Sequence, residues 1–178
     1  MYPHPYLEYL VQFHAERDYF ECHEILEEYW KSEAGQRSPV WVGLIQIAVG
    51  LYHHRRGNQA GAVKMMNSAL RILEQQQEAI GRLGLEPATL LHLLHDVVTE
   101  MEAGAPYRSI SLPIADPNLR LRVQQMCAER GLPCDRPSDM GNRYLLHKHT
   151  LRDRSAVIAE RARQLSLRDR HKQNGQSR

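Results

Sequence analysis

Cysteine is scarce in this sequence, and the segments that mark secreted and membrane proteins are missing. The three cysteines, Cys22, Cys127 and Cys134, are an odd number and lack the paired spacing of a structural zinc site. We therefore expect free thiols in a reducing, cytoplasmic setting. No basic and apolar leader opens the sequence, so we expect no signal peptide. The longest apolar run, residues 40–52, contains Gln46 and is too short to span a bilayer.

The sequence also lacks the local motifs of several enzyme classes. It contains no glycine-rich phosphate loop, no Gly-x-Ser-x-Gly elbow and no internal repeat, so nucleotide binding and nucleophilic catalysis have no support. No stretch sustains the alternation of a β-strand, whereas apolar residues recur at helical spacing. With 42% hydrophobic and 25% charged residues, this pattern predicts an all-α fold. We expect a compact bundle of about five core helices plus a C-terminal helical extension.

Capping residues, prolines and glycines predict where the helices begin and end. We expect a helical core domain at residues 1–104. Residues 105–178 are expected to form a connector and a two-helix extension with a basic last helix. The third helix is apolar nearly all round and should be buried, and the cations at its end, including Arg55, suit the negative end of the helix dipole. The helices are expected at residues 5–16, 19–33, 39–56, 59–83, 87–103, 117–130 and 138–172.

The second expected helix carries the densest group of chemically active side chains. His23 and Glu27 lie one turn apart, so an imidazole and a carboxylate can converge on one point. Such groups are ligands of zinc, manganese and iron. One hypothesis is therefore a metal-binding protein or a metal-dependent hydrolase, with His23, Glu27 and His53 as ligands. Glu24 would then be a general base that acts through a bound water.

The third expected helix adds small and polar residues to this picture. Gly43, Gly50 and Gly57 recur every seven residues and give the helix a smooth face that another helix can approach closely. Gln46 and His53 lie near this face, and buried polar side chains need partners. The favoured reading is an interaction or scaffold module with a buried polar network, in which the polar groups fix how the helices pack. Its members are His23, Glu24, Glu27, Gln46 and His53.

A further histidine group lies on the fifth expected helix. His92, His95 and Asp96 have the spacing of metal ligands, although histidines beside an acid are also common on a helix surface.

Charge is unevenly distributed along the chain. Residues 1–142 carry 13 basic and 18 acidic side chains, whereas residues 143–178 carry 10 basic and 3 acidic ones. The basic segment could neutralise phosphates, but no set of stacking aromatics accompanies it, so nucleic-acid binding is the less favoured alternative. An acidic and a basic helix can also pair within one chain, across a homodimer or with a protein partner; no membrane partner is expected. The apolar stripe of the last helix is narrow, and comprises Tyr144, Leu151, Ile158 and Leu165.

Three blocks of the sequence resemble a known family. They are residues 19–30, residues 43–49, and Tyr52-His53 with Arg56-Gly57-Asn58; the first contains Phe-Glu-x-His-Glu-x-x-Glu-x-x-Trp. This hallmark resembles that of a bacterial and archaeal family of small helical proteins classed as a domain of unknown function, in the longer form found in Gram-positive spore formers.

The resemblance covers about residues 13–75, and nothing carries over beyond Ala103. It implies an all-α fold and a cytosolic protein, and it supplies no activity. It directs attention to the residues on which the hallmark falls, which are His23, Glu24, Glu27, Trp30, Gln46 and His53.

Overall fold

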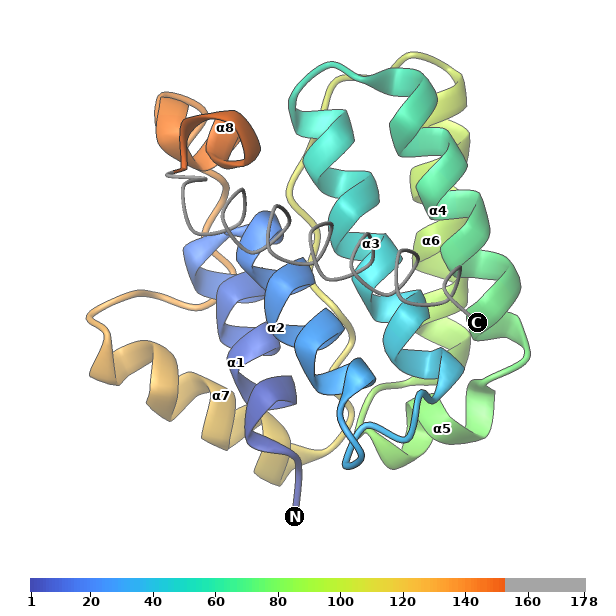
Figure 1. The fold of residues 1–178 in the computed structure, drawn as a ribbon, viewed down its shortest axis with the longest axis vertical. Helices are drawn as coiled ribbons and strands as arrows, with labels where there is room; N and C mark the ends of the chain where they lie inside the picture. The colour runs from blue at the N-terminus through green and yellow to red at the C-terminus, as the bar shows by residue number, and fades with distance from the viewer. Residues whose placement is uncertain (153–178) are drawn as a thin grey trace, which may run out of the picture. The chain divides into compact units, whose positions relative to one another are not determined.

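The computed structural model describes residues 1–152, and its regular elements are helices (Figure 1). Within these residues β-pairing is confined to an isolated bridge between Leu85 and Ile114. The all-α prediction is therefore confirmed. The elements are α1 (His4–Val11), the π-helix η1 (Gln12–Glu16), α2 (Tyr19–Lys31), α3 (Pro39–Arg55), α4 (Gln59–Glu74), α5 (Gln77–Arg82), α6 (Pro87–Glu102), α7 (Pro117–Glu129) and α8 (Arg143–Leu151).

The chain divides into two compact units, Met1–Leu146 and His147–Arg178. The first unit contains α1 to α7 and the beginning of α8. Residues 105–146, which the sequence assigns to a C-terminal extension, therefore lie in the same unit as the helices that precede them. The expected last helix begins at Arg143 rather than Ser138. Its continuation beyond residue 152, with Ile158 and Leu165, lies outside the described residues.

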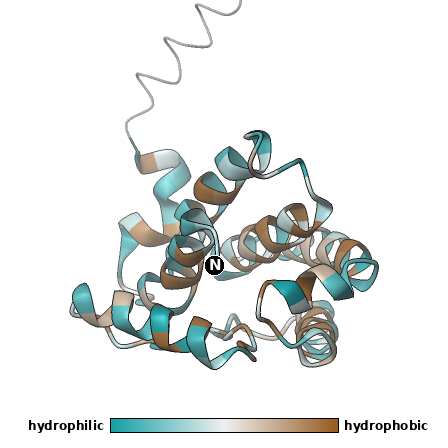
Figure 2. Ribbon diagram, turned by 90° about the horizontal axis from the view of Figure 1, so that it is seen from below, coloured by the Kyte–Doolittle hydropathy of each residue, from teal (hydrophilic) through white to brown (hydrophobic). Residues whose placement is uncertain are grey.

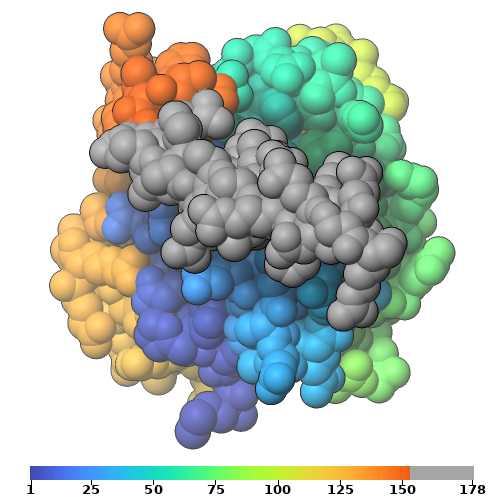
Figure 3. Space-filling view, in the orientation of Figure 1, coloured from blue at the N-terminus to red at the C-terminus, as the bar shows by residue number. Residues whose placement is uncertain are grey.

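The helices of the first unit pack in a continuous series. Helix α2 lies between α1 and α3, α3 packs against α4, and α4 packs against α6 (Figure 1). Helix α7 packs against α1, and α5 packs against α4 and α6, so α7 and α5 lie on opposite flanks of the face in Figure 3. Hydrophobic residues line the helix contacts, whereas the ribbon of α7 is mostly hydrophilic (Figure 2). No helix within residues 1–152 is long and apolar enough to cross a membrane.

Several helices begin at the capping residues that the sequence indicated. The side chain of Asp18 accepts a hydrogen bond from the Glu21 N–H at 3.0 Å, and Asn58 accepts one from Gly61 at 3.0 Å. Asp116 does the same at the start of α7. Helices α3, α6 and α7 also have proline in their first turn, where its missing N–H has no cost.

Besides the start of the last helix, three other features differ from the sequence prediction. The single helix expected at residues 59–83 is two helices, because Gln76 leaves helical geometry and Ile80 then turns into the core. No glycine or proline marks this break. Helix α2 ends at Lys31, before the expected Ala34-Gly35, because the backbone of Ser32 is extended. The first helix changes to π-helical geometry over Gln12–Glu16.

The third helix is buried, as expected from its apolar sequence. Twelve of its 17 residues are buried. Its smooth face packs on α4: a Cβ at Gly43 would lie 2.5 Å from Leu73, and one at Gly50 would lie 3.2 Å from Met66. Gly57 lies past the helix end at φ +78, where nothing lies within 4 Å of a Cβ, so it forms a turn and makes no helix contact.

The guanidinium group of Arg17 is fully buried and ties three segments together. Arg17 ends η1 in the left-handed conformation, at φ 57. Its Nη1 donates hydrogen bonds to the carbonyl oxygens of Phe13 at 2.9 Å and Ile110 at 2.5 Å. Its Nε donates to the Arg136 carbonyl at 2.7 Å. Neutral acceptors thus satisfy a buried cation, and they fix the connector and the loop after α7 on the core.

Arg55 is buried at the end of α3, where the sequence indicated only a dipole interaction. Its Nη1 donates to the Arg17 carbonyl at 2.7 Å and to Ser138 Oγ at 3.1 Å. Its Nη2 donates to the Leu145 carbonyl at 3.2 Å, and the guanidinium lies 4.6 Å from the ring centroid of Tyr19. Arg55 therefore joins α3 to η1 and to the start of α8.

Replacing Gly43 by alanine should destabilise the protein. The new Cβ meets the buried Leu73 side chain, and overpacking of this kind costs about 1–3 kcal/mol, which exceeds the gain in helix propensity of about 1 kcal/mol. Gly81→Ala is the matched control, since its Cβ meets only Pro87 at 4.0 Å. Urea unfolding should give a lower free energy for Gly43→Ala and an unchanged or higher one for Gly81→Ala. Equal stability of the two variants would contradict the packing described.

Replacing Arg55 by methionine should also lower the free energy of unfolding. Methionine fills similar space but leaves three buried acceptors without their charged donor, for a loss of about 3 kcal/mol. Arg56→Met is the control. The guanidinium of Arg56 lies over the Tyr52 ring at 5.1 Å, so this variant measures the loss of a cation–π contact. Urea unfolding compares the two. If Arg55→Met lost no more stability than Arg56→Met, the donor role assigned to Arg55 would be wrong.

Candidate functional site

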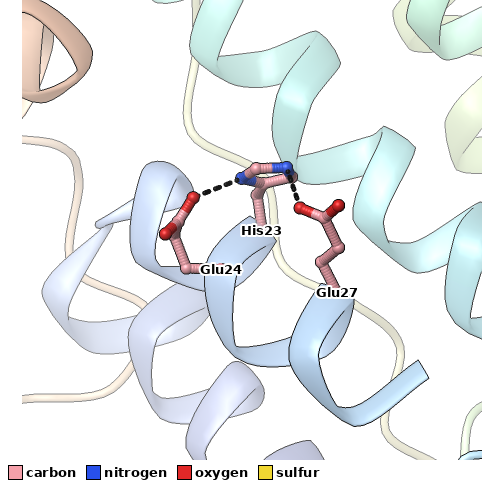
Figure 4. A group of neighbouring side chains, drawn as sticks. All are labelled: His23, Glu24 and Glu27. Atoms are coloured by element: carbon pink, nitrogen blue, oxygen red, sulfur yellow. Dashed lines mark ion pairs between the residues drawn. The ribbon is translucent and has the colours of Figure 1, made fainter. Parts of the chain in front are cut away.

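His23, Glu24 and Glu27 come together on the outer side of α2 (Figure 4). The adjoining side of the helix faces the core with Tyr19 and Cys22. His23 Nδ1 lies 3.3 Å from a Glu24 oxygen, and His23 Nε2 lies 2.9 Å from a Glu27 oxygen. One ligand atom from each residue lies within 4.8 Å of the others. The imidazole is thus held between two carboxylates, in the arrangement that the i,i+4 spacing indicated.

The three side chains are partly exposed. The exposed fractions are 29% for His23, 41% for Glu24 and 35% for Glu27. Solvent, and therefore a dissolved ion, has direct access to them. The partial exposure also leaves the carboxylates room to rotate, so this site differs from the buried network that the sequence favoured.

Glu27 has a second cationic neighbour. Its other carboxylate oxygen lies 2.5 Å from Lys31 Nζ, one turn further along the helix. The hydrogen bond from Lys31 and the neighbouring His23 hold the pKa of Glu27 below its usual value. Glu27 therefore stays ionised, as metal binding and ion pairing both require.

His53 lies outside this group. Its Nδ1 lies 3.0 Å from the side-chain nitrogen of Asn58, which caps α4. Burial, together with the positive charge of Arg56, lowers the pKa of His53. The ring therefore favours its neutral form and accepts the hydrogen bond from Asn58. The structure places His53 at the turn between α3 and α4.

The other two hallmark residues, Gln46 and Trp30, are partly buried. Gln46 has its Oε1 buried without a hydrogen-bond partner in the described part of the chain, and the same holds for Trp30 Nε1. The Trp30 ring lies 5.6 Å from the guanidinium carbon of Arg37.

His92 and His95 face different carboxylates, at Asp96 and Glu74. Within residues 1–152, the group around His23 is the one whose three side chains are close enough together to hold a metal ion.

A second site, which the sequence did not indicate, is a cleft of about 570 Å³. It lies between the connector, the first half of α7 and the loop that follows α7, and its lining includes His14, Ser111, Cys134 and Asp135. The ring of His14 is almost fully buried, and its Nδ1 donates to the Asp135 carboxylate at 2.6 Å. Ser111 Oγ donates to the same carboxylate at 2.5 Å. These residues are up to 121 positions apart, so no local spacing could reveal them.

The carboxylate of Asp135 is a strong acceptor in this cleft. The hydrogen bond from His14, with the one from Ser111, lowers the pKa of Asp135 from 3.8 to about 2. The backbone supports the same contact, because the Asp135 N–H donates to the His14 carbonyl at 2.8 Å. Asp135 thus anchors the loop after α7 to η1.

The basic C-terminal segment is described only as far as residue 152. Nucleic-acid binding through residues 143–178 therefore stays a prediction that rests on charge.

Two comparisons with known proteins place this chain among relatives. A family model described as "Domain of unknown function (DUF309)" matches residues 6–65. A protein of Bacillus subtilis (strain 168), described as uncharacterized protein YpuF, is 47% identical over 169 residues, which are 94% of this chain and 97% of that protein. No solved structure matches. The resemblance seen in the sequence is confirmed, and the similarity extends well past the range of residues 13–75 from which it was recognised.

Acid should remove the stabilisation that the Asp135 contact provides. Because the pKa of Asp135 is lower in the folded protein than in the unfolded chain, its contribution is complete above about pH 4 and is lost as the pH falls toward about 2. Asp135→Asn should therefore be less stable than the native protein at pH 6, and the difference should shrink toward pH 2.

Urea unfolding at a series of pH values measures this difference. Asp139→Asn is the control, since Asp139 lies in the same loop and, within residues 1–152, its side chain accepts only from the nearby Gly141 N–H. A stability difference for Asp135→Asn that does not change between pH 6 and pH 2 would rule out the hydrogen bonds assigned to the Asp135 carboxylate.

Proposed function

The chain belongs to the DUF309 family, and we propose that it binds a divalent metal ion on α2 through His23, Glu24 and Glu27. The observation that carries the proposal is the convergence of three ligand atoms, one from each residue, within 4.8 Å of one another. An imidazole nitrogen and two carboxylate oxygens are the donor set of many zinc, manganese and non-haem iron sites.

The fit to an ion requires the side chains to rotate, because Glu24 lies at Nδ1 and Glu27 at Nε2 of the same ring. In a tetrahedral zinc site with bonds of about 2.1 Å, the ligand atoms are about 3.4 Å apart. His23 Nε2 and the Glu27 oxygen are 2.9 Å apart, so these two atoms would move slightly away from each other around an ion. The Glu24 oxygen would move closer to them. Glu24 and Glu27 are more than a third exposed, so solvent reaches both carboxylates.

The present neighbours of Glu27 are compatible with an ion. One carboxylate oxygen faces His23 and the other faces Lys31. A metal that replaces the hydrogen bond between His23 and Glu27 leaves the contact with Lys31 in place, and such outer contacts orient ligands in known sites. The lowered pKa of Glu27 supports an ionised ligand.

Three protein ligands would leave coordination positions for water, as in catalytic zinc sites. The metal-dependent hydrolase reading assigned Glu24 as a general base. In the site proposed here Glu24 is itself a ligand of the ion, so it is not free to act as a general base. We therefore limit the proposal to metal binding. His53, the third ligand in that reading, has no part in it because its ring faces Asn58.

The experiment is a titration of untagged, metal-free protein with Zn²⁺ and Mn²⁺ by calorimetry and thermal unfolding. We expect one bound ion per chain and a rise in stability of about 2.7 kcal/mol when the free ion exceeds its dissociation constant a hundredfold. His23→Ala and Glu27→Gln should each weaken binding more than about tenfold, since ligand loss exceeds the effect of outer contacts. Binding should also weaken in acid, because protons compete for the same ligand atoms.

Glu28→Gln is the matched control, because Glu28 is exposed and lies on the same helix beside Glu27. The same charge is removed there, and the affinity should change by no more than about twofold. Absence of stoichiometric binding, or equal losses in the Glu27 and Glu28 variants, would defeat the proposal. The three side chains would then be an ion-pair network on a helix of an interaction or scaffold protein.

The three free cysteines also support a cytoplasmic location, since reducing compartments keep thiols unpaired. A homodimer or another protein partner remains a prediction from the charge pattern.

A further inference from the structure

One of the three cysteines, Cys134, lines the cleft, and a second one, Cys127, lies in the adjoining helix α7. Cys127 lies in the last turn of α7 and is 1% exposed. Cys134 is half-buried and lines the cleft beside Asp135. Both thiols are free. One is therefore open to a small molecule in the cleft, and the other lies behind it in the core.

The end of α7 brings these two residues together. The Leu132 N–H donates to the Cys127 carbonyl at 3.0 Å, and the Gly131 N–H donates to Ala128 at 2.9 Å, with Gly131 at φ 67. This pair of bonds is a Schellman turn, which reverses the chain at a helix end. Two residues later Cys134 lies against the core. The backbone thus returns Cys134 toward the helix turn that carries Cys127.

The Cys134 thiol is a neighbour of Cys127. Burial, together with this neighbouring thiol, raises the pKa of Cys127 to about 12. Cys127 therefore stays protonated, and a reagent meets Cys134 first. A reachable thiol with a second, resolving thiol beside it is the arrangement found in redox-sensing proteins.

We propose that Cys127 and Cys134 are a redox-active dithiol that a low-molecular-weight disulfide converts into an intramolecular disulfide. The reagent enters the cleft, and the cleft volume of about 570 Å³ is enough for a small thiol compound. The proposal is independent of the metal site on α2.

The chemistry is thiol–disulfide exchange in two steps. The Cys134 thiolate attacks one sulfur of the reagent, the reagent S–S bond breaks, and one half leaves as a thiolate while the other stays on Cys134. Cys127 then gives up its proton and attacks the Cys134 sulfur, which expels the second half. The protein is oxidised by two electrons and the reagent is reduced to two thiols, which take up the two protons that the cysteines lose.

Oxidation would act on the contact between the loop and η1. Asp135 directly follows Cys134, and it bonds to His14 through both its N–H and its carboxylate. A new covalent bond at residue 134 therefore shifts the residue that anchors this loop. The position of Asp135 in the cleft would therefore differ between the reduced and the oxidised protein.

Glutathione disulfide is the probe, applied to the full chain at neutral pH. After reaction the protein is denatured, its thiols are alkylated, and its peptides are mapped without reduction by mass spectrometry. The reduced protein has three free thiols. We expect one after oxidation, on Cys22, and a peptide linked between Cys127 and Cys134. Cys22 is the internal control, because it is fully buried and its Sγ donates to the Tyr9 carbonyl at 3.6 Å.

Two variants separate the steps. Cys127→Ser should stop at a stable mixed disulfide on Cys134, whereas Cys134→Ser should retain both remaining thiols. The proposal is decided by the measurement on the native protein, so it can still be tested if a variant folds poorly. A native protein that keeps three thiols, that accumulates only the mixed disulfide, or that forms a link to Cys22 would overturn the proposal.

Discussion

The buried guanidinium groups of Arg17 and Arg55 hold together segments that are 83 to 119 residues apart in the chain. Among the described residues neither forms an ion pair with a carboxylate, so carbonyl oxygens, a serine hydroxyl and aromatic faces balance both charges. A buried cation without such acceptors would be very costly. The loops that supply the acceptors are therefore constrained to one conformation, and the connector and the loop after α7 owe their order to these two side chains.

This constraint links both candidate sites through a single turn. His14, which lies in η1, contacts Asp135 in the cleft. Arg17 ends η1 in a left-handed conformation, and Asp18 immediately caps α2. The π-helix and the turn after it thus set both the orientation of His14 and the starting point of the helix that carries His23. Such π-helical turns are frequent at functional sites, because the wider turn redirects side chains.

Local rules explain what the sequence could predict. Asp18, Asn58 and Asp116 mark helix starts because capping acts over three residues, and His23 meets Glu27 because one helical turn fixes their separation. The break at Gln76 carried no local signal. The neighbours of Arg55 come from η1, from the loop after α7 and from the start of α8. A sequence reading limited to neighbouring residues therefore assigned Arg55 to the helix dipole. His53 failed to join His23 because Asn58, five residues away, offers its ring a nearer partner.

The two sites also differ in how firmly the fold determines them. The group on α2 depends on one helix, and its partly exposed side chains can rearrange around a ligand without moving the backbone. The cleft depends on three segments that meet only in the folded chain, and the contact between Asp135 and His14 holds one of them in place. A change at residue 134 is therefore transmitted to η1, because the adjacent Asp135 is bonded there through both backbone and side chain. The geometry of the cleft therefore depends on contacts between segments that are distant in the sequence, whereas the group on α2 lies within one helix.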